Sequence, residues 1–172
     1  MKKIPLQTLV RKLRHSFLAA LRTASIDAAY GDILFCCEKY LGISPEITSY
    51  ALPVGTFIYM PSSSVASMVF IMYVARSYGI VISGVWCVTA MFLTVTLTMA
   101  SPPMVGVGLL AYAAIFIRLG IPEEGLTVAL MADILFGFVC TAVNQAVLQL
   151  ELVIHADREG LLDLDILQKR VS

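Results

Sequence analysis

The sequence predicts an all-α, polytopic membrane protein with two re-entrant helical hairpins, a discontinuous transmembrane helix and a long C-terminal transmembrane helix. Hydrophobic residues make up 59% of the 172-residue chain, and the mean hydropathy of +0.86 is well above that of soluble globular proteins. Charged side chains are absent from residues 47–75 and 77–117, and Asp133 is the only one in residues 125–150. Prolines and serines interrupt several of these apolar segments. Together these features indicate lipid surroundings and helices that are broken at bilayer depth.

Basic side chains crowd residues 1–15, which we expect to form an amphipathic segment at the cytoplasmic membrane surface. They are Lys2, Lys3, Arg11, Lys12 and Arg14. By the positive-inside rule, this end lies in the cytoplasm of a multi-pass inner-membrane protein. The mixed charges of residues 156–172 predict a cytoplasmic tail with a short helix, so we place both termini in the cytoplasm.

The first hairpin is predicted over residues 16–37. Its arms, residues 16–24 and 28–37, are each too short to cross about 30 Å of hydrocarbon at about 1.5 Å per residue. The polar "SID" at residues 25–27 separates them and would form the tip. Non-helical backbone at that depth requires protein or a water-filled cavity around it.

A discontinuous transmembrane helix is predicted over residues 46–76. The segment is long enough to span, but "YMPSSS" at residues 59–64 interrupts it. A proline in a helix interior removes one backbone hydrogen bond and clashes with the preceding turn. We therefore expect two half-helices that meet at this motif.

A second re-entrant hairpin is predicted over residues 80–118. The apolar stretches 80–100 and 104–117 flank "SPP", and the second stretch is too short to span easily. By length, the first stretch could instead be a complete span, and that topology is kept as an alternative.

The last membrane helix is predicted over residues 125–155, where it would be about 45 Å long and would project beyond the bilayer core. At about 100° per residue, a polar stripe runs along the face of Asp133. It comprises Asp133, Gly137, Cys140, Asn144 and Glu151, with Thr141 at its edge. Because a carboxylate inside a span costs about 2.5–3.5 kcal/mol on insertion scales, Asp133 should be paired, hydrated or protonated. It would either bind a hairpin tip or contact a substrate.

Breaks in apolar segments are predicted at residues 25–27, 59–64 and 101–108. In lipid, each break would leave backbone amides and carbonyls unpaired at a cost of several kcal/mol, so the breaks should face one another or a ligand. Broken half-helices that meet near the midplane are typical of transporter binding sites. The alternative is that these breaks are hinges or kinks in an ordinary helical bundle.

Enzymatic, metal-binding and nucleic-acid-binding functions are not supported by the residue pattern. No C-x-x-C spacing or histidine cluster accompanies the cysteines, which are Cys36, Cys37, Cys87 and Cys140. Both histidines, His15 and His155, lie at the charged ends of the chain, and no histidine is near Cys36 and Cys37 in sequence. The basic cluster is short and lacks interleaved aromatic residues. We therefore expect neither an enzyme nor a nucleic-acid partner.

The order of hairpin, broken helix, hairpin and polar-striped helix, together with "GISPEITSYALPVGTFIYMPSSS" and "LGIPEEG…ADILFGFVCTAVNQ", resembles the dicarboxylate/amino acid:cation symporter family, which includes glutamate transporters. The resemblance covers nearly the whole chain but only the C-terminal half of a family member, which forms most of the mobile transport domain. It implies secondary active transport of a small organic solute such as a dicarboxylate or amino acid. Na⁺ or H⁺ would be the coupling ion, and no other cofactor is implied. The partners would be the lipid bilayer and a separate N-terminal scaffold half, with a homotrimer if that scaffold is supplied.

The resemblance also implies which residues form the site. The substrate-binding positions correspond to Ser25, Asp27, Ser63, Gly106, Gly108, Asp133, Cys140, Thr141 and Asn144. The cation-binding positions correspond to Gly55, Tyr59 and Asn144.

Several positions depart from the family pattern. The amine-binding aspartate is replaced by Gly137, the arginine that reads the substrate side chain by Cys140, and a cation-binding aspartate by Leu148. In the broken helix, "NMDGT" becomes "YMPSS", so Ser63 stands where a threonine contacts substrate. The sequence also permits a second function, that of a non-transporting membrane interaction protein or remnant with the same fold.

Overall fold

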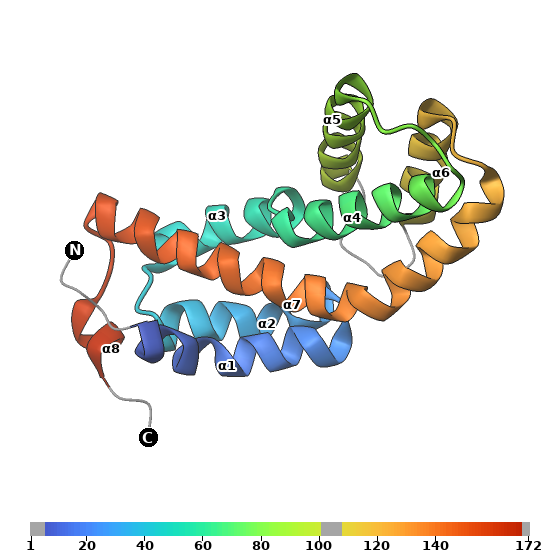
Figure 1. Ribbon diagram of the computed structural model, residues 1–172. Coiled ribbons are helices and arrows are strands. Elements are labelled where there is room, and N and C mark those ends of the chain that lie inside the picture. Colours follow the sequence, from blue (N-terminus) through green and yellow to red (C-terminus); the bar gives the residue numbers. More distant parts are fainter. Residues whose placement is uncertain (1–5, 101–107, 170–172) are drawn as a thin grey trace.

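The computed structural model describes residues 6–100 and 108–169. The regular secondary structure of these residues is helical, and they contain no strand, only isolated bridge residues such as the pair Ile43 and Leu162, which confirms the predicted all-α class. In Figure 1, one long helix runs along the molecule and the shorter helices pack around its two halves.

Two antiparallel helices, α1 (Leu6–Thr23) and α2 (Ile26–Phe35), begin the fold (Figure 1). The chain reverses at Ala24, whose φ is 49°, and at Ser25, whose hydroxyl accepts a hydrogen bond from the Ala28 amide. We expected a separate segment to end at residue 15, but α1 continues through that boundary because no proline or glycine interrupts it.

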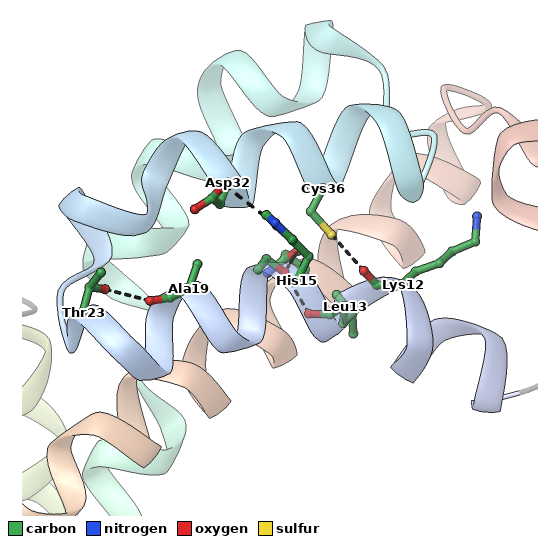
Figure 2. Close-up of polar contacts among 9 residues, drawn as sticks. Lys12, Leu13, His15, Ala19, Thr23, Asp32 and Cys36 are labelled. Carbon is green, nitrogen blue, oxygen red and sulfur yellow. Dashed lines mark hydrogen bonds and ion pairs between the residues drawn. The ribbon is translucent and has the colours of Figure 1, made fainter. Parts of the chain in front are cut away.

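Two polar contacts join α1 to α2 and to the residue that follows α2 (Figure 2). The Cys36 thiol lies 3.5 Å from the Lys12 carbonyl, and His15 Nδ1 lies 3.8 Å from Asp32 Oδ1. Cys36 begins a π-helix, η1 (Cys36–Tyr40), that ends this part of the chain.

The next two helices, α3 (Pro45–Ile58) and α4 (Pro61–Ser77), are separated by Tyr59 and Met60. Met60 has φ −125° and ψ 54°, outside the helical region. Pro61 is the first residue of α4, where its missing N–H costs nothing because first-turn amides have no partner within the helix. The interruption therefore coincides with the predicted "YMPSSS" motif.

Helices α5 (Gly84–Ala100) and α6 (Gly108–Leu119) pack against each other. α5 starts at Gly84, later than the predicted residue 80, because Ser83 accepts a hydrogen bond from the Trp86 amide and caps the helix. At this same end of the pair, the Trp86 indole donates to the carbonyl of Leu119, the last residue of α6, at 3.3 Å. The predicted hairpin tip, residues 101–103, lies outside the described residues.

The long helix α7 (Leu126–Glu159) follows a short 3₁₀ turn, η2 (Glu123–Gly125), and ends at Gly160, whose φ is 70°. It exceeds the predicted end at residue 155 because a left-handed glycine is what terminates it. A short helix, α8 (Leu164–Gln168), then packs beside the start of α1 (Figure 1).

Two hydrophobic cores lie along α7. One combines α1, α2, η1 and α3 with the C-terminal half of α7, and the other combines α4, α5 and α6 with its N-terminal half. Many large apolar side chains remain on the outside, including Phe92 and Leu135, which are 70% and 72% exposed. Within residues 6–100 and 108–169, two segments are long and apolar enough to cross a membrane, Pro45–Ser77 and Glu123–Glu159. Exposed apolar surface on these helices is consistent with a lipid environment.

Candidate functional site

Asn144 of α7 binds the first turn of α4 at the interruption between α3 and α4. Its Oδ1 accepts hydrogen bonds from the Ser62 amide at 2.9 Å and from the Ser62 hydroxyl at 2.7 Å. Its Nδ2 donates to the Ser63 hydroxyl at 2.9 Å. The residue at the N-cap of α4, Met60, offers no side-chain hydrogen bond. Asn144 therefore satisfies a helix N-terminus that has no cap in its own segment.

A second set of contacts holds α4 against α7 one turn earlier on α7. The Ser62 hydroxyl lies 2.9 Å from the Cys140 carbonyl, so its single hydrogen is shared between that carbonyl and Asn144. The Cys140 thiol in turn lies 3.9 Å from the Ser62 carbonyl. These bonds fix the break in the chain against the polar stripe of α7.

A cavity opens beside these contacts, bounded by α4, α5, α6 and α7 and by Ile26 of the first hairpin. Its described polar lining comprises Ser63, Ser67, Thr98, Tyr112, Asp133, Cys140, Thr141 and Asn144. Asp133 is the only aspartate, glutamate, lysine, arginine or histidine among the described lining residues. The cavity thus combines hydroxyl, amide and thiol groups with one carboxylate.

Asp133 lies against the start of α6. A Cβ added to Gly108, the first residue of α6, would stand 3.3 Å from Asp133 Oδ2. A carboxylate at this position is favoured by the partial positive charge of a helix N-terminus. On the same side of the cavity, the Tyr112 and Ser67 hydroxyls lie 2.9 Å apart and join α6 to α4.

The cavity brings together six of the predicted substrate-binding residues: Ser63, Gly108, Asp133, Cys140, Thr141 and Asn144. Ser25 and Asp27 are not among its lining residues. The Ser25 hydroxyl caps α2, and Asp27 is exposed, whereas the side chain between them, Ile26, reaches the cavity. Gly106 lies outside the described residues.

The three predicted cation-binding residues lie along the interruption and α7. The Gly55 carbonyl accepts the Tyr59 amide at 2.8 Å, and Tyr59 packs against the hydrophobic core around α1. Leu148 fills the space next to Gly55, because a Cβ added to that glycine would stand 2.5 Å from Leu148 Cδ1. Among the described residues, no group of three or more histidine, cysteine, aspartate or glutamate side chains could hold a metal ion.

Sequence reasoning did not single out Ser62, Ser67, Thr98 or Tyr112 as site residues. Ser62 follows Pro61 directly, and an amide in the first turn of a helix needs an acceptor from outside the helix. The position of Ser62 could therefore have indicated that it binds a side chain of another segment. Ser67 and Tyr112 each lie four residues after a predicted site residue, on the same helix face.

Comparison with known proteins links this arrangement to transporters. Residues 1–147 match the sequence pattern described as the sodium:dicarboxylate symporter family. Excitatory amino acid transporter 2 of Homo sapiens is 27% identical over 129 residues, which are 75% of this chain and 22% of that protein. The proton/glutamate-aspartate symporter of Escherichia coli (strain K12) is 29% identical over 139 residues, which are 79% of this chain and 31% of that protein. An excitatory amino acid transporter of Caenorhabditis elegans is 25% identical over 135 residues, or 78% of this chain and 27% of that protein. The chain therefore spans less than a third of the length of these relatives.

Proposed function

We propose, on the premise that this chain belongs to the sodium:dicarboxylate symporter family, that it forms the solute-binding transport domain of a secondary active transporter. The observation that carries this proposal is the cavity beside the interruption at Tyr59 and Met60, lined by Asp133 and by a chain of hydroxyl groups. A polar cavity between broken or short apolar helices is where membrane transporters bind their substrates.

The charge of the cavity supports an amine-bearing or uncharged solute over a dicarboxylate. Asp133 is the single carboxylate among the described lining residues, and no lysine or arginine is among them. A second carboxylate on a solute is usually bound by a bidentate arginine, which the thiol of Cys140 cannot replace. A solute amine would meet the field of Asp133, and hydroxyl groups such as those of Ser67 and Tyr112 would orient its polar atoms.

In the membrane, α1 with α2 and α5 with α6 would be re-entrant hairpins, while α3–α4 and α7 would span the inner membrane with both termini in the cytoplasm. The two long apolar segments and the exposed apolar side chains support this topology. By the resemblance, the domain would move like an elevator, with the second hairpin as its outer gate. Because Asp133 lies against the start of α6, a movement of the second hairpin would change the surroundings of this side chain in the site.

Transport would require a scaffold. These residues span 22% to 31% of the length of the relatives compared above, so the scaffold and the trimer contacts would come from segments outside them, whether in the same chain or in another. Sodium or a proton would be the coupling ion.

Uptake into proteoliposomes tests the proposal. The chain, reconstituted with a co-expressed scaffold half, should accumulate labelled amines or neutral amino acids in preference to dicarboxylates, under a sodium or proton gradient. Asp133→Asn should reduce uptake at least tenfold, whereas Glu124→Gln, which removes an exposed carboxylate next to the start of α7, should leave it unchanged. Absence of uptake with the scaffold supplied would reject transport.

The hydrogen-bonding of Asn144 favours a second candidate, a non-transporting interaction protein, because the interruption is satisfied without any ligand. Cys140 separates the two functions. A solute pathway should admit small thiol reagents to this cavity-lining cysteine, and solute should slow the reaction, while the buried Cys36 and Cys37 should not react.

A further inference from the structure

We propose that ligand binding in this domain is independent of sodium, because the predicted cation positions are occupied by the chain's own groups. The inference concerns the site of the proposed function and rests on it. The family description names sodium, so the ability of Gly55, Tyr59 and Asn144 to hold a cation can be compared atom by atom with what these groups already bind.

The amide oxygen of Asn144 already has two donors next to it. Oδ1 accepts from the Ser62 amide, and it shares the hydrogen of the Ser62 hydroxyl with the Cys140 carbonyl. The remaining group, Nδ2, is a donor and points at Ser63 Oγ. To bind a cation, Asn144 would have to give up contacts that satisfy the first turn of α4. The side chain is 2% exposed, so water cannot replace those contacts at low cost.

The space beside Gly55 is apolar. Leu148 projects from α7 directly at this glycine, is 4% exposed and belongs to the hydrophobic core around α1. One lone pair of the Gly55 carbonyl is already used by the Tyr59 amide. A cation placed here would contact methyl groups where a negative oxygen is required, and burying an unpaired charge is strongly unfavourable.

The nearby carboxylates do not complete a site. Asp133 lies on the cavity side, against the start of α6, whereas Glu151, an exposed residue in the C-terminal half of α7, places its carboxylate beside the Tyr59 hydroxyl. Between them the α7 face carries Asn144 and Leu148, which bring an already bonded amide and a hydrocarbon chain. The described residues hold no cluster of acidic ligands. At Gly55 and Asn144, a hard cation that requires several oxygen ligands therefore finds no negatively charged oxygen, and the carboxylate of Glu151 is already paired with the Tyr59 hydroxyl.

Thermal unfolding of the full chain in detergent tests this inference, with sodium ion itself as the probe. The unfolding midpoint should be the same in sodium chloride, potassium chloride and choline chloride at equal ionic strength. If a cation site were present, a sodium concentration about a hundred times its Kd would raise the unfolding midpoint by about 5–10 °C in a protein of this size. A saturable rise specific to sodium would overturn the inference.

Two variants of Leu148 connect the result to this position. Leu148→Asp places a carboxylate beside Gly55, and its midpoint should rise with sodium, whereas the uncharged Leu148→Asn should not respond. If the aspartate variant fails to fold, the wild-type comparison still decides the question. Radioactive sodium binding by the wild-type chain provides an independent measurement, and saturable binding would contradict the proposal.

The experiment separates this inference from the proposed function. Sodium-dependent stability is measured without solute, scaffold or transport, so a failure of solute uptake leaves its outcome unchanged. Conversely, uptake that persists in a sodium-free medium would support both statements, and sodium-stimulated stability with intact uptake would reject only the sodium-independence.

Discussion

At the scale of single residues, two neighbouring amides on α7 have opposite situations. Asn144 uses its oxygen and nitrogen in three hydrogen bonds to the start of α4. Gln145, which is 1% exposed, has no hydrogen-bond partner for its Oε1 or Nε2 in the part of the chain that the structure describes. One turn later, Gln149 is fully buried but bonded, because its Oε1 accepts from the Ser16 hydroxyl at 3.0 Å and its Nε2 donates to the Gln145 carbonyl at 3.1 Å. Burial alone therefore does not indicate what a polar side chain contributes.

This contrast predicts opposite effects for two matched substitutions. Gln145→Met keeps the side-chain length and removes an unsatisfied amide, so it should raise the free energy of unfolding by about 1 kcal/mol. Gln149→Met breaks two bonds, leaving Ser16 with only the Leu13 carbonyl as acceptor, so it should lower that free energy by about 1–3 kcal/mol. Chemical unfolding in detergent micelles measures both. Equal destabilisation by the two variants would contradict the assignment.

At the scale of the elements, α3 and α7 approach closely because a glycine meets a leucine. A Cβ on Gly55 would come within 2.5 Å of Leu148 Cδ1, a distance that real Cβ atoms do not tolerate. Leu148 belongs to the hydrophobic core around α1, so this contact packs that core against the last turn of α3, next to the interruption between α3 and α4. Gly55, which was predicted to bind a cation, thus forms a packing contact between α3 and α7.

The contact can be tested by a compensating pair of substitutions. Gly55→Ala should lower the free energy of unfolding by about 1–3 kcal/mol, and Leu148→Ala introduced beside it should recover part of that loss. The control is Gly31→Ala on α2, where no atom lies within 4 Å of the new Cβ and helix propensity should make the change neutral or slightly stabilising. Additive effects of the two substitutions would show that the contact is not formed.

At the scale of the whole molecule, α7 connects two cores, and one lysine connects three distant segments. Lys12 Nζ donates to the Tyr40 carbonyl at 2.6 Å and to the Ile166 carbonyl at 2.7 Å, so it joins α1 to the end of η1 and to α8. Burial lowers the pKa of this amine, and the nearby Cys36 opposes that shift. Backbone bonds from Ser44 to Leu161 and from Asp163 to Gly42 complete the attachment of the tail. The tail therefore closes the end of the molecule at which α1 begins (Figure 1).

Removing this lysine should release the tail. Lys12→Met keeps the apolar stem but loses both donors, so we expect limited proteolysis to cut between α7 and α8 at least several times faster than in the wild type. Lys39→Met, which changes an exposed lysine on η1, serves as the control and should not alter the cleavage rate. Unchanged cleavage in the Lys12 variant would mean that the tail is held by its backbone bonds alone.

Local chemistry in the sequence determined the helical class and the break at residues 59–64, whereas the predicted boundaries at residues 15, 80 and 155 differ from the observed helix ends. Uncharged segments predicted lipid surroundings, Pro61 begins α4, and Gly160 ends α7 because only a glycine adopts its left-handed conformation at no cost. The polar face of α7 was also readable, since residues three, four and seven apart share one side of a helix.

Tertiary structure alone decided which of those polar groups remain available to bind a solute or a cation. No spacing rule shows that Asn144 is saturated by Ser62 and Ser63, that Leu148 fills the space at Gly55, or that Ile26 reaches the cavity in place of its polar neighbours. The physical reason is that helix periodicity is a property of one segment. Hydrogen-bond saturation and close packing depend instead on where segments more than 80 residues apart in the sequence meet, as Ser62 and Asn144 do with a separation of 82 residues.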